Sequence, residues 1–169
     1  MNIRQENSND YEQVYNLVKK AFESAEHSDG NEHELVCALR KSQSFIPELS
    51  LVALTANKIV GHIMFSRATV DNEDILILAP LSVLPEFQNK GIGSALIKEG
   101  HKTACRLGYE YCAVLGSEKY YPRFGYVISS DYGIQPPKGI PTQNFMVVKL
   151  SAKAKNVNGY VKFAKEFGI

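Results

Sequence analysis

One segment of sixteen residues constrains the fold most, because it passes from a strand into a helix through a short turn. It runs Leu81-Ser82-Val83-Leu84-Pro85-Glu86-Phe87-Gln88-Asn89-Lys90-Gly91-Ile92-Gly93-Ser94-Ala95-Leu96. Gly91 and Gly93 have no Cβ atom, so a ligand can approach the main chain closely there. The first N–H groups of the following helix point into the turn, and with the helix dipole they attract phosphate. Ser94 and Lys90 would add a hydroxyl and a positive charge to this anion site.

The same segment also fits a tight strand-to-helix turn without a ligand, because an isolated Gly-x-Gly often occurs by chance. Two nucleotide-binding motifs are excluded by its wider sequence. It lacks the Gly-Lys-Ser/Thr of a Walker loop, and the third glycine of a dinucleotide-binding Gly-x-Gly-x-x-Gly would fall at Leu96. ATP hydrolysis and dinucleotide binding therefore lose most of their support.

The remaining periodicity predicts a mixed α/β sheet. Apolar residues recur at helical spacing over 11–22 and 32–40, and Asn9 with Glu12 are expected to form a capping box before the first helix. Strands are predicted over 51–55 and 59–65 as a hairpin, over 75–83, over 109–115, near Tyr126 and over 145–150. A helix is predicted over 92–107, a short helical segment before Tyr126, a loop over 136–141, and a terminal helix containing Val157, Tyr160, Val161 and Phe163.

Composition restricts the class of protein further. The 169 residues suffice for one core and indicate a single domain over 1–169. Lysine and arginine total 19 against 18 acidic residues, so no general attraction to nucleic acid or an anionic membrane is expected. The chain shows neither a signal-peptide core nor an apolar run of membrane-spanning length, and Cys37, Cys105 and Cys112 are interpreted as core residues. A soluble cytoplasmic protein is the resulting expectation.

The loop Gln88-Asn89-Lys90-Gly91-Ile92-Gly93 resembles the Gln/Arg-x-x-Gly-x-Gly/Ala loop of the GNAT acyltransferases, in that family's strand-loop-helix order. The resemblance implies that main-chain N–H groups bind the pyrophosphate of acyl-CoA and that the preceding strand pairs with the pantetheine arm. The implied cofactor-binding residues are Leu81, Ser82, Val83, Gln88, Asn89, Lys90, Gly91, Ile92, Gly93 and Ser94. The implied fold is a mostly antiparallel sheet, flanked by helices and splayed at the central acyl-CoA site. Pro80 suits that splay, although the strand could instead begin at Leu81.

A second motif follows the strand predicted over 109–115. Tyr121 stands four residues before the pair Gly125-Tyr126, as a tyrosine does in GNAT proteins, and the two motifs together extend the resemblance over nearly the whole chain. Many relatives carry an asparagine and then an alanine after this strand, whereas here the stretch is Gly116-Ser117-Glu118-Lys119. The segment resembles a bacterial subgroup with a short Tyr-Tyr-x-Arg-Phe-Gly-aromatic sequence.

The resemblance implies acyl transfer by direct attack of an amine on the thioester. Such a reaction forms an oxyanion and expels a thiolate, and a protonated tyrosine can supply the proton. Tyr121 is the expected general acid, with Tyr120 as the alternative. A main-chain N–H near Ser82 or Val83 would hold the oxyanion. The general base is left open between His62, Glu23 and water.

The predicted function is transfer of an acetyl group from acetyl-CoA to a primary amine of a small molecule or protein, with no metal ion. The acidic side chains of Glu23, Glu26, Asp29, Glu32 and Glu34 favour a cationic amine or form an ordinary solvated surface, and the spacing of His27 and His33 indicates no metal site. One alternative is a CoA-binding sensor or accessory module without turnover. Another is a generic nucleotide-binding domain that prefers ATP or NAD. A homodimer is a possible assembly.

Overall fold

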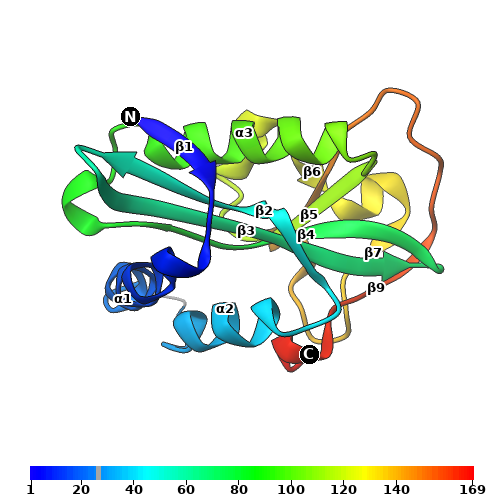
Figure 1. Ribbon diagram of the computed structural model, residues 1–169. Helices are drawn as coiled ribbons and strands as arrows, with labels where there is room; N and C mark the ends of the chain where they lie inside the picture. Colours follow the sequence, from blue (N-terminus) through cyan, green and yellow to red (C-terminus); the bar gives the residue numbers. More distant parts are fainter. Residues whose placement is uncertain (26–27) are drawn as a thin grey trace.

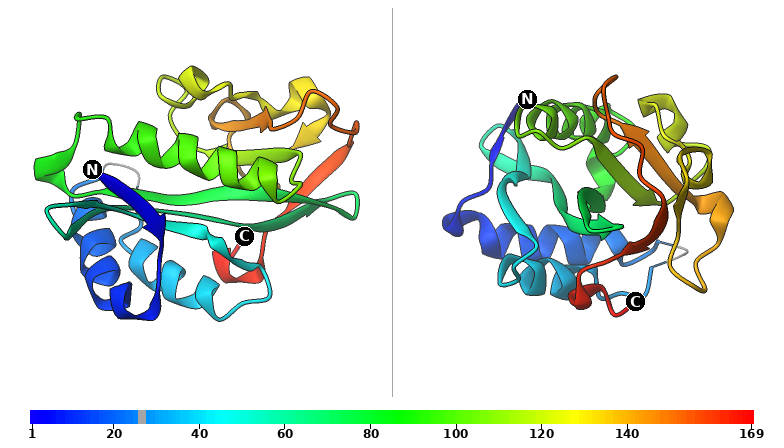
Figure 2. Two further views of the ribbon diagram at one scale, coloured as in Figure 1. Left: turned by 45° about the horizontal axis from the view of Figure 1, so that its top comes forward. Right: turned by 90° about the vertical axis from the view of Figure 1, so that its right-hand side faces the viewer.

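The computed structural model describes residues 1–25 and 28–169 and places helices on both faces of a twisted sheet (Figure 1). α3 (Ile92–Arg106) covers one face, and α1 (Tyr11–Phe22) and α2 (Glu32–Arg40) cover the other (Figure 2). The prediction of these three helices is confirmed to within one residue at their ends. Short 3-10 helices connect the larger elements: η1 (Ser8–Asp10), η2 (Pro85–Phe87), η3 (Tyr121–Phe124), η4 (Ser129–Tyr132), η5 (Thr142–Asn144) and η6 (Lys165–Phe167).

The main sheet has the strand order β1-β2-β3-β4-β5-β8-β6. Its strands are β1 (Asn2–Gln5), β2 (Phe45–Thr55), β3 (Lys58–Val70), β4 (Glu73–Val83), β5 (Tyr111–Leu115), β6 (Val127–Ile128) and β8 (Phe145–Lys149). β4 and β5 are parallel, whereas the other neighbours in this order are antiparallel. The predicted mixed, mostly antiparallel sheet is therefore confirmed.

Two tight hairpins connect β2, β3 and β4. Ala56 and Asn57 have φ of 49° and 64°, and Asp71 and Asn72 have φ of 50° and 64°. Two successive left-handed residues are typical of the type I′ turn, whose twist matches that of the flanking strands. Because both turns need only two residues, β3 extends from Lys58 to Val70, beyond the predicted 59–65, whereas β2 is longer than predicted at its other end, where it begins at Phe45.

The sheet opens between β4 and β5. These strands pair at two positions, Leu76 with Cys112 and Ile77 with Ala113. Beyond them β4 stays with β3 as far as Val83, while β5 stays with β8 as far as Leu115. The two strands therefore diverge, as the family resemblance implied.

β4 runs through Pro80, so the alternative in which this strand begins at Leu81 is wrong. Pro80 lies at a register shift, because Leu78 faces Phe65 whereas Leu81 faces Ile63. A proline, which has no N–H to donate, is tolerated at such an irregularity.

Two other expectations are wrong, and two strands were not predicted. The chain near Tyr160 and Val161 forms β9 (Gly159–Lys162), which pairs with β3 and with β7 (Ile134–Gln135), instead of a terminal helix. The capping box before α1 is made by Asn7 and Asp10, not by Asn9 and Glu12. β1 and β7 had no counterpart in the predicted elements.

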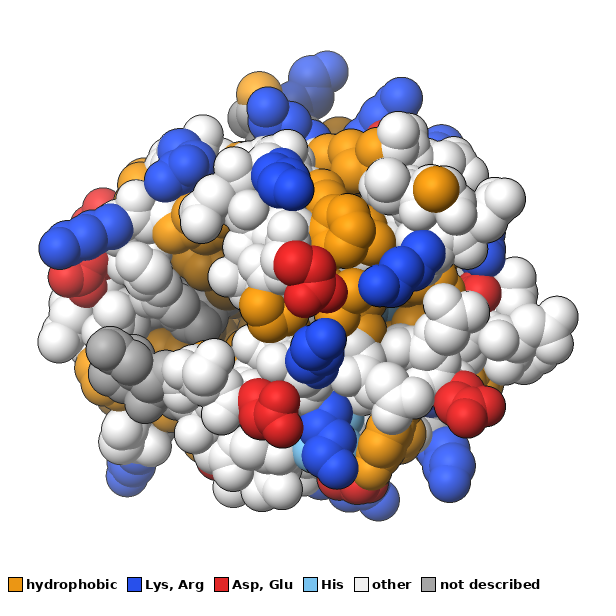
Figure 3. All heavy atoms as spheres, turned by 90° about the vertical axis from the view of Figure 1, so that its left-hand side faces the viewer, with side chains coloured by type: hydrophobic (Ala, Val, Ile, Leu, Met, Phe, Trp, Pro, Cys, Tyr) orange, Lys and Arg blue, Asp and Glu red, His pale blue; other side chains and the backbone are white. Residues whose placement is uncertain are grey.

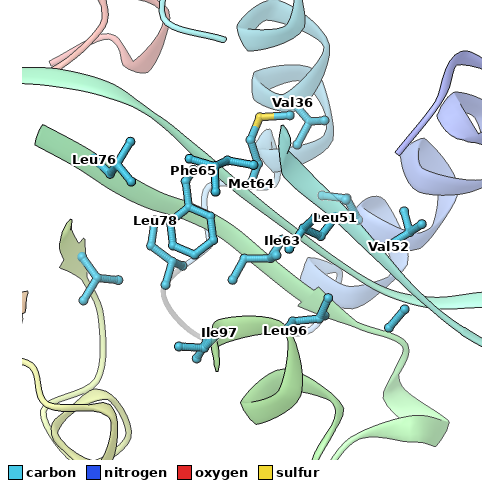
Figure 4. Packing of buried hydrophobic residues seen from close by; sticks show 14 of the residues in the cluster. Val36, Leu51, Val52, Ile63, Met64, Phe65, Leu76, Leu78, Leu96 and Ile97 are labelled. Carbon is cyan, nitrogen blue, oxygen red and sulfur yellow. The ribbon is translucent and has the colours of Figure 1, made fainter. Parts of the chain in front are cut away.

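Apolar side chains from both faces of the sheet fill the core (Figure 4). Phe65 projects toward α3, and Met64, the preceding residue, lies beside Val36 of α2. Gly100 of α3 allows the closest approach, because a Cβ atom there would lie 2.2 Å from Phe65 Cε2. The alternation along β3 thus fixes which face each helix covers.

The three cysteines differ in burial. Cys112 is buried, Cys37 is half-buried and Cys105 is exposed. The expectation that all three are core residues is therefore wrong for Cys105, whose Sγ donates to the carbonyl of Leu150 at 3.0 Å.

Candidate functional site

A cavity of about 500 Å³ lies where the end of β4, the following loop and the start of α3 meet. Its lining residues are Leu81, Val83, Phe87, Gln88, Asn89, Gly91, Ile92, Gly93, Ser94, Tyr120 and Arg123. At this end of the molecule hydrophobic surface gathers near the centre, with Lys and Arg side chains around it (Figure 3). Both motifs found in the sequence therefore contribute residues to the lining of one cavity.

The glycine turn leaves a set of main-chain donors free. Gly91 has φ of 85° and precedes the first helical residue, and a Cβ atom on it would meet no atom within 4 Å. Ala95 makes the first helical hydrogen bond, to the carbonyl of Gly91 at 3.0 Å. Among the described residues, none accepts a hydrogen bond from the N–H groups of 92–94. These donors at a helix start form an arrangement suited to an anion.

Eight of the ten predicted cofactor-binding residues line the cavity: Leu81, Val83, Gln88, Asn89, Gly91, Ile92, Gly93 and Ser94. The structure places Ser82 and Lys90 elsewhere. The Ser82 side chain is buried on the opposite face of the sheet, and Lys90 Nζ lies 5.5 Å from the centre of the Phe87 ring. Phe87 and Arg123 were not predicted to line a site.

The register of β4 decides which main-chain groups face the cavity side. Leu84 N–H donates to the carbonyl of Val60 at 2.9 Å. Because bonded pairs alternate in an antiparallel ladder, Ser82 directs its N–H toward β3, and Leu81 and Val83 direct theirs toward the opening beside β5. Gln88 Nε2 donates to the carbonyl of Val83 at 3.1 Å, which is consistent with this direction.

Tyr120 and Tyr121 occupy different positions at the start of η3. Tyr120 lines the cavity, and its Oη would lie 2.9 Å from a Cβ atom on Gly93. Tyr121 packs deeper, with its ring edge-to-face against Tyr126 at 5.7 Å, and Gly116 makes room for it because a Cβ atom there would lie 2.5 Å from Tyr121 Cε2. Burial raises the pKa of Tyr121 well above its ordinary value, so its phenol stays protonated.

The Tyr126 ring, against which Tyr121 packs, belongs to a hydrogen-bonded group with His101 and Cys112. Tyr126 shares its hydroxyl between His101 Nε2 at 2.8 Å and Cys112 Sγ at 3.3 Å. Burial lowers the pKa of His101 to about 4 and raises that of Cys112 to about 12. Cys112 is therefore a protonated thiol, which does not suit it to act as a nucleophile.

His62, one of the candidate bases, lies on the other face of the sheet. Its side chain is 0% exposed, and its Nε2 lies 3.1 Å from Ser50 Oγ. Ser50 donates to Glu6 at 2.8 Å, and Arg40 Nε donates to the same carboxylate at 3.1 Å. Burial lowers the pKa of His62 to about 4, so the ring is neutral near pH 7. His62 does not line the cavity described above.

The acidic segment borders a second, smaller cavity of about 310 Å³ near the end of α1. Glu23 and Asp29 line it, whereas Glu32 accepts from Ser28 Oγ at 2.7 Å and Glu34 accepts from Tyr15 Oη at 2.8 Å. Glu26 and His27 lie outside the described residues. Within 1–25 and 28–169, no group of three His, Cys, Asp or Glu side chains could hold a metal ion, and no helix is long and apolar enough to cross a membrane.

The amino-acid sequence is similar to those of known proteins. Residues 47–128 match the model of the acetyltransferase (GNAT) domain family. The N-acetyltransferase YjhQ of Escherichia coli K12 is 38% identical over 141 residues, which cover 79% of this chain and 78% of YjhQ.

Two solved structures are similar over most of the chain. The GNAT family N-acetyltransferase YhbS of E. coli in complex with CoA has a TM-score of 0.90 at 27% identity, covering 99% of this chain and 92% of YhbS. A GNAT family acetyltransferase of Brucella melitensis in complex with acetyl-CoA has a TM-score of 0.82 at 30% identity, covering 98% of this chain and 97% of that one.

Proposed function

The chain belongs to the GNAT acetyltransferase family and is an acetyl-CoA-dependent N-acetyltransferase, and from that premise we propose that acetyl-CoA binds in the cavity between the glycine turn and η3. The observation that carries this proposal is the row of free N–H groups at the start of α3, directly beside the opening between β4 and β5. The CoA and acetyl-CoA complexes of the two structural relatives support the same ligand.

The lining residues fit the chemistry of this ligand. A diphosphate needs clustered donors, which residues 92–94 offer, and the absent Cβ of Gly91 leaves space for it. Leu81 and Val83 provide an apolar wall for the pantetheine arm. The N–H groups of Leu81 and Val83 face the opening and can pair with the amides of that arm, as an added strand would.

We propose Tyr121 as the general acid. The attacking amine forms a bond to the thioester carbonyl carbon, the carbon–sulfur bond breaks, and Tyr121 donates its proton to the leaving sulfur. The oxyanion is held by the N–H of Val83 or Leu81, because Ser82 directs its N–H toward β3. The proton of the amine passes to water or to Glu23, since His62 is sealed on the opposite face.

We propose a primary amine as the acceptor, in a small molecule or a protein. Glu23 and Asp29 on the second cavity support a cationic one. We propose that the protein works in the cytoplasm and that residues 1–169 form one domain. A homodimer is the proposed assembly, and sedimentation of the purified chain tests it.

The test of Tyr121 compares two neighbouring tyrosines. CoA release from acetyl-CoA is followed across amines, polyamines, amino acids and peptides for the parent, Tyr121→Phe and Tyr120→Phe, with acetyl-CoA binding measured in each. An acid role predicts that Tyr121→Phe binds acetyl-CoA like the parent while kcat falls about 10²-fold or more. A larger loss of kcat in Tyr120→Phe would transfer the role to Tyr120. Donor binding without release for every acceptor would favour the sensor alternative.

A further inference from the structure

Arg123 differs from the other arginines in its surroundings. Of the five arginines, Arg4, Arg40 and Arg67 donate to protein oxygens. Among the described residues, no protein oxygen accepts a hydrogen bond from Arg106 or Arg123, and of these two only Arg123 lines the donor cavity. A free guanidinium therefore stands at the wall of the cavity.

The local structure holds Arg123 in this place. It lies in η3. Pro122, near the start of η3, has a restricted φ, and Gly125, with φ of 93°, caps the end of this short helix. Its guanidinium carbon lies 4.7 Å from the centre of the Tyr120 ring. The Tyr120 hydroxyl in turn reaches over Gly93. Tyr120 and Arg123 thus line the cavity together, beside the free N–H groups of the glycine turn.

The nearest acidic residue in the sequence does not neutralise Arg123. Glu118 Oε2 accepts instead from Asn144 Nδ2 at 3.0 Å, and within 1–25 and 28–169 no carboxylate lies within 4.0 Å of the Arg123 guanidinium. A planar guanidinium on an aromatic ring keeps its donors available and suits phosphate. The cavity consequently offers cationic and N–H donors from two sides.

We propose that Arg123, which lines the same cavity as the glycine turn, binds a phosphate group of the donor. This inference rests on the proposed function of the cavity. The phosphate belongs either to the diphosphate or to the 3′-phosphate of the nucleotide.

The test measures the Kd of three donors by calorimetry on the full chain. These are acetyl-CoA, acetyl-3′-dephospho-CoA and S-acetylpantetheine, which has no phosphate. Arg123→Gln is compared with the control Arg106→Gln. Arg106 is the last residue of α3, and its replacement removes the same charge away from the cavity. Arg123→Lys keeps the positive charge but loses the planar set of guanidinium donors. It should therefore bind acetyl-CoA more tightly than Arg123→Gln and less tightly than the parent.

We expect Arg123→Gln to weaken acetyl-CoA binding about ten- to a hundredfold, with Arg106→Gln like the parent. S-acetylpantetheine should bind equally to the parent and to Arg123→Gln. If the 3′-phosphate is the partner, the loss disappears with acetyl-3′-dephospho-CoA, and if the diphosphate is the partner, the loss persists.

Two results would overturn the inference while leaving the donor cavity intact. One is a parent that binds acetyl-CoA with Arg123→Gln unchanged. The other is an equal loss for S-acetylpantetheine, which would assign Arg123 a role in shaping the wall. A parent that binds no acetyl-CoA at all would overturn the proposed function as well.

Discussion

The two faces of the sheet carry polar groups of opposite kinds. On the α3 face, the glycine turn and Arg123 present donors that have no protein acceptor among the described residues. On the face under α1 and α2, Glu6, Arg40 and Ser50 satisfy one another in a buried network beside His62, whose Nδ1 is the one polar atom of these four side chains that is buried without a partner among the described residues. Because unmet donors cost free energy unless water or a ligand meets them, the first set is suited to a ligand and the second to holding the fold.

This contrast also separates two residues that look alike in sequence. His62 and Tyr121 are both titratable side chains, on a predicted strand and a predicted short helical segment, and both were candidates for proton transfer. His62 is closed off by the network, whereas Tyr121 lies behind a residue that lines the cavity. Chemical type alone therefore does not identify a catalytic group.

The largest effect is expected from Glu6→Gln, which removes the charge that balances Arg40. The Glu6 and Arg40 side chains are 1% and 8% exposed, so the variant leaves a buried guanidinium without a counter-charge. Breaking a buried pair in this way costs about 3–5 kcal/mol. Urea unfolding at pH 7 measures the loss.

Glu48→Gln serves as the control, because Glu48 is exposed on β2. It should change the free energy of unfolding by less than about 0.5 kcal/mol. Equal stability of Glu6→Gln and Glu48→Gln would remove the distinction between the two faces.

A second effect concerns the dependence of stability on pH. The pKa of His62 is lowered to about 4 in the folded state, against an ordinary value of 6.5, by burial and secondarily by Arg40, while Glu6 acts in the opposite direction. The contribution of neutral His62 to the free energy of unfolding is therefore complete above pH 6.5 and is lost as the pH falls from 6.5 toward 4. The loss between pH 7 and pH 4.5 is about 2–3 kcal/mol.

His62→Gln should remove this part of the acid sensitivity. Unfolding measured at pH 7 and pH 4.5 would show a smaller difference in the variant than in the parent. His101, whose pKa is also lowered to about 4, supplies part of what remains. An unchanged difference would mean that His62 is accessible to protons in the folded state.

A third effect separates binding from stability on the α3 face. Gly93→Ala places a Cβ atom 2.9 Å from the Tyr120 hydroxyl, at the end of a side chain that can move, so donor affinity should fall about tenfold while stability is kept. Gly100→Ala, on the same helix, meets the buried Phe65 ring and should cost about 1–3 kcal/mol of stability instead. Loss of stability in both variants would contradict the separation.

The sequence predicted the glycine side of the site well because that information is local. The residues from Leu81 to Ser94 follow one another through a strand, a turn and a helix, and eight of the ten predicted to bind the cofactor line the cavity; their contact with the cofactor stays a prediction. Arg123 was missed because its placement depends on how η3 folds against the glycine turn, whereas Phe87 lies in η2 within the local segment and was not interpreted as a lining residue. The aromatic and arginine character of Tyr120-Tyr121-Pro122-Arg123 was a usable signal, but only the tyrosines were interpreted.

The errors in the fold have a similar cause. Val157, Tyr160 and Val161 fit a helical spacing, but Tyr160 pairs with β7, and Val161 with Lys162 pairs with the end of β3. Tertiary pairing thus overrides the local pattern, which in a short segment does not distinguish helix from strand. Two-residue turns at Ala56-Asn57 and Asp71-Asn72 likewise lengthen the hairpin strands beyond their apolar runs.

The smallest effect concerns Lys90. It tests whether donor affinity depends on the positive charge of this end of the molecule in general or on the guanidinium that lines the cavity. Lys90 stands next to the glycine turn, yet its Nζ lies over the Phe87 ring and its side chain does not line the cavity. Lys90→Gln should therefore raise the Kd for acetyl-CoA only about twofold, an effect that high salt removes because exposed charges are screened. A calorimetric titration at low and high salt measures this beside Arg123→Gln. If Lys90→Gln matched the loss in Arg123→Gln, the general positive potential of this end, rather than the guanidinium at the wall, would govern donor binding.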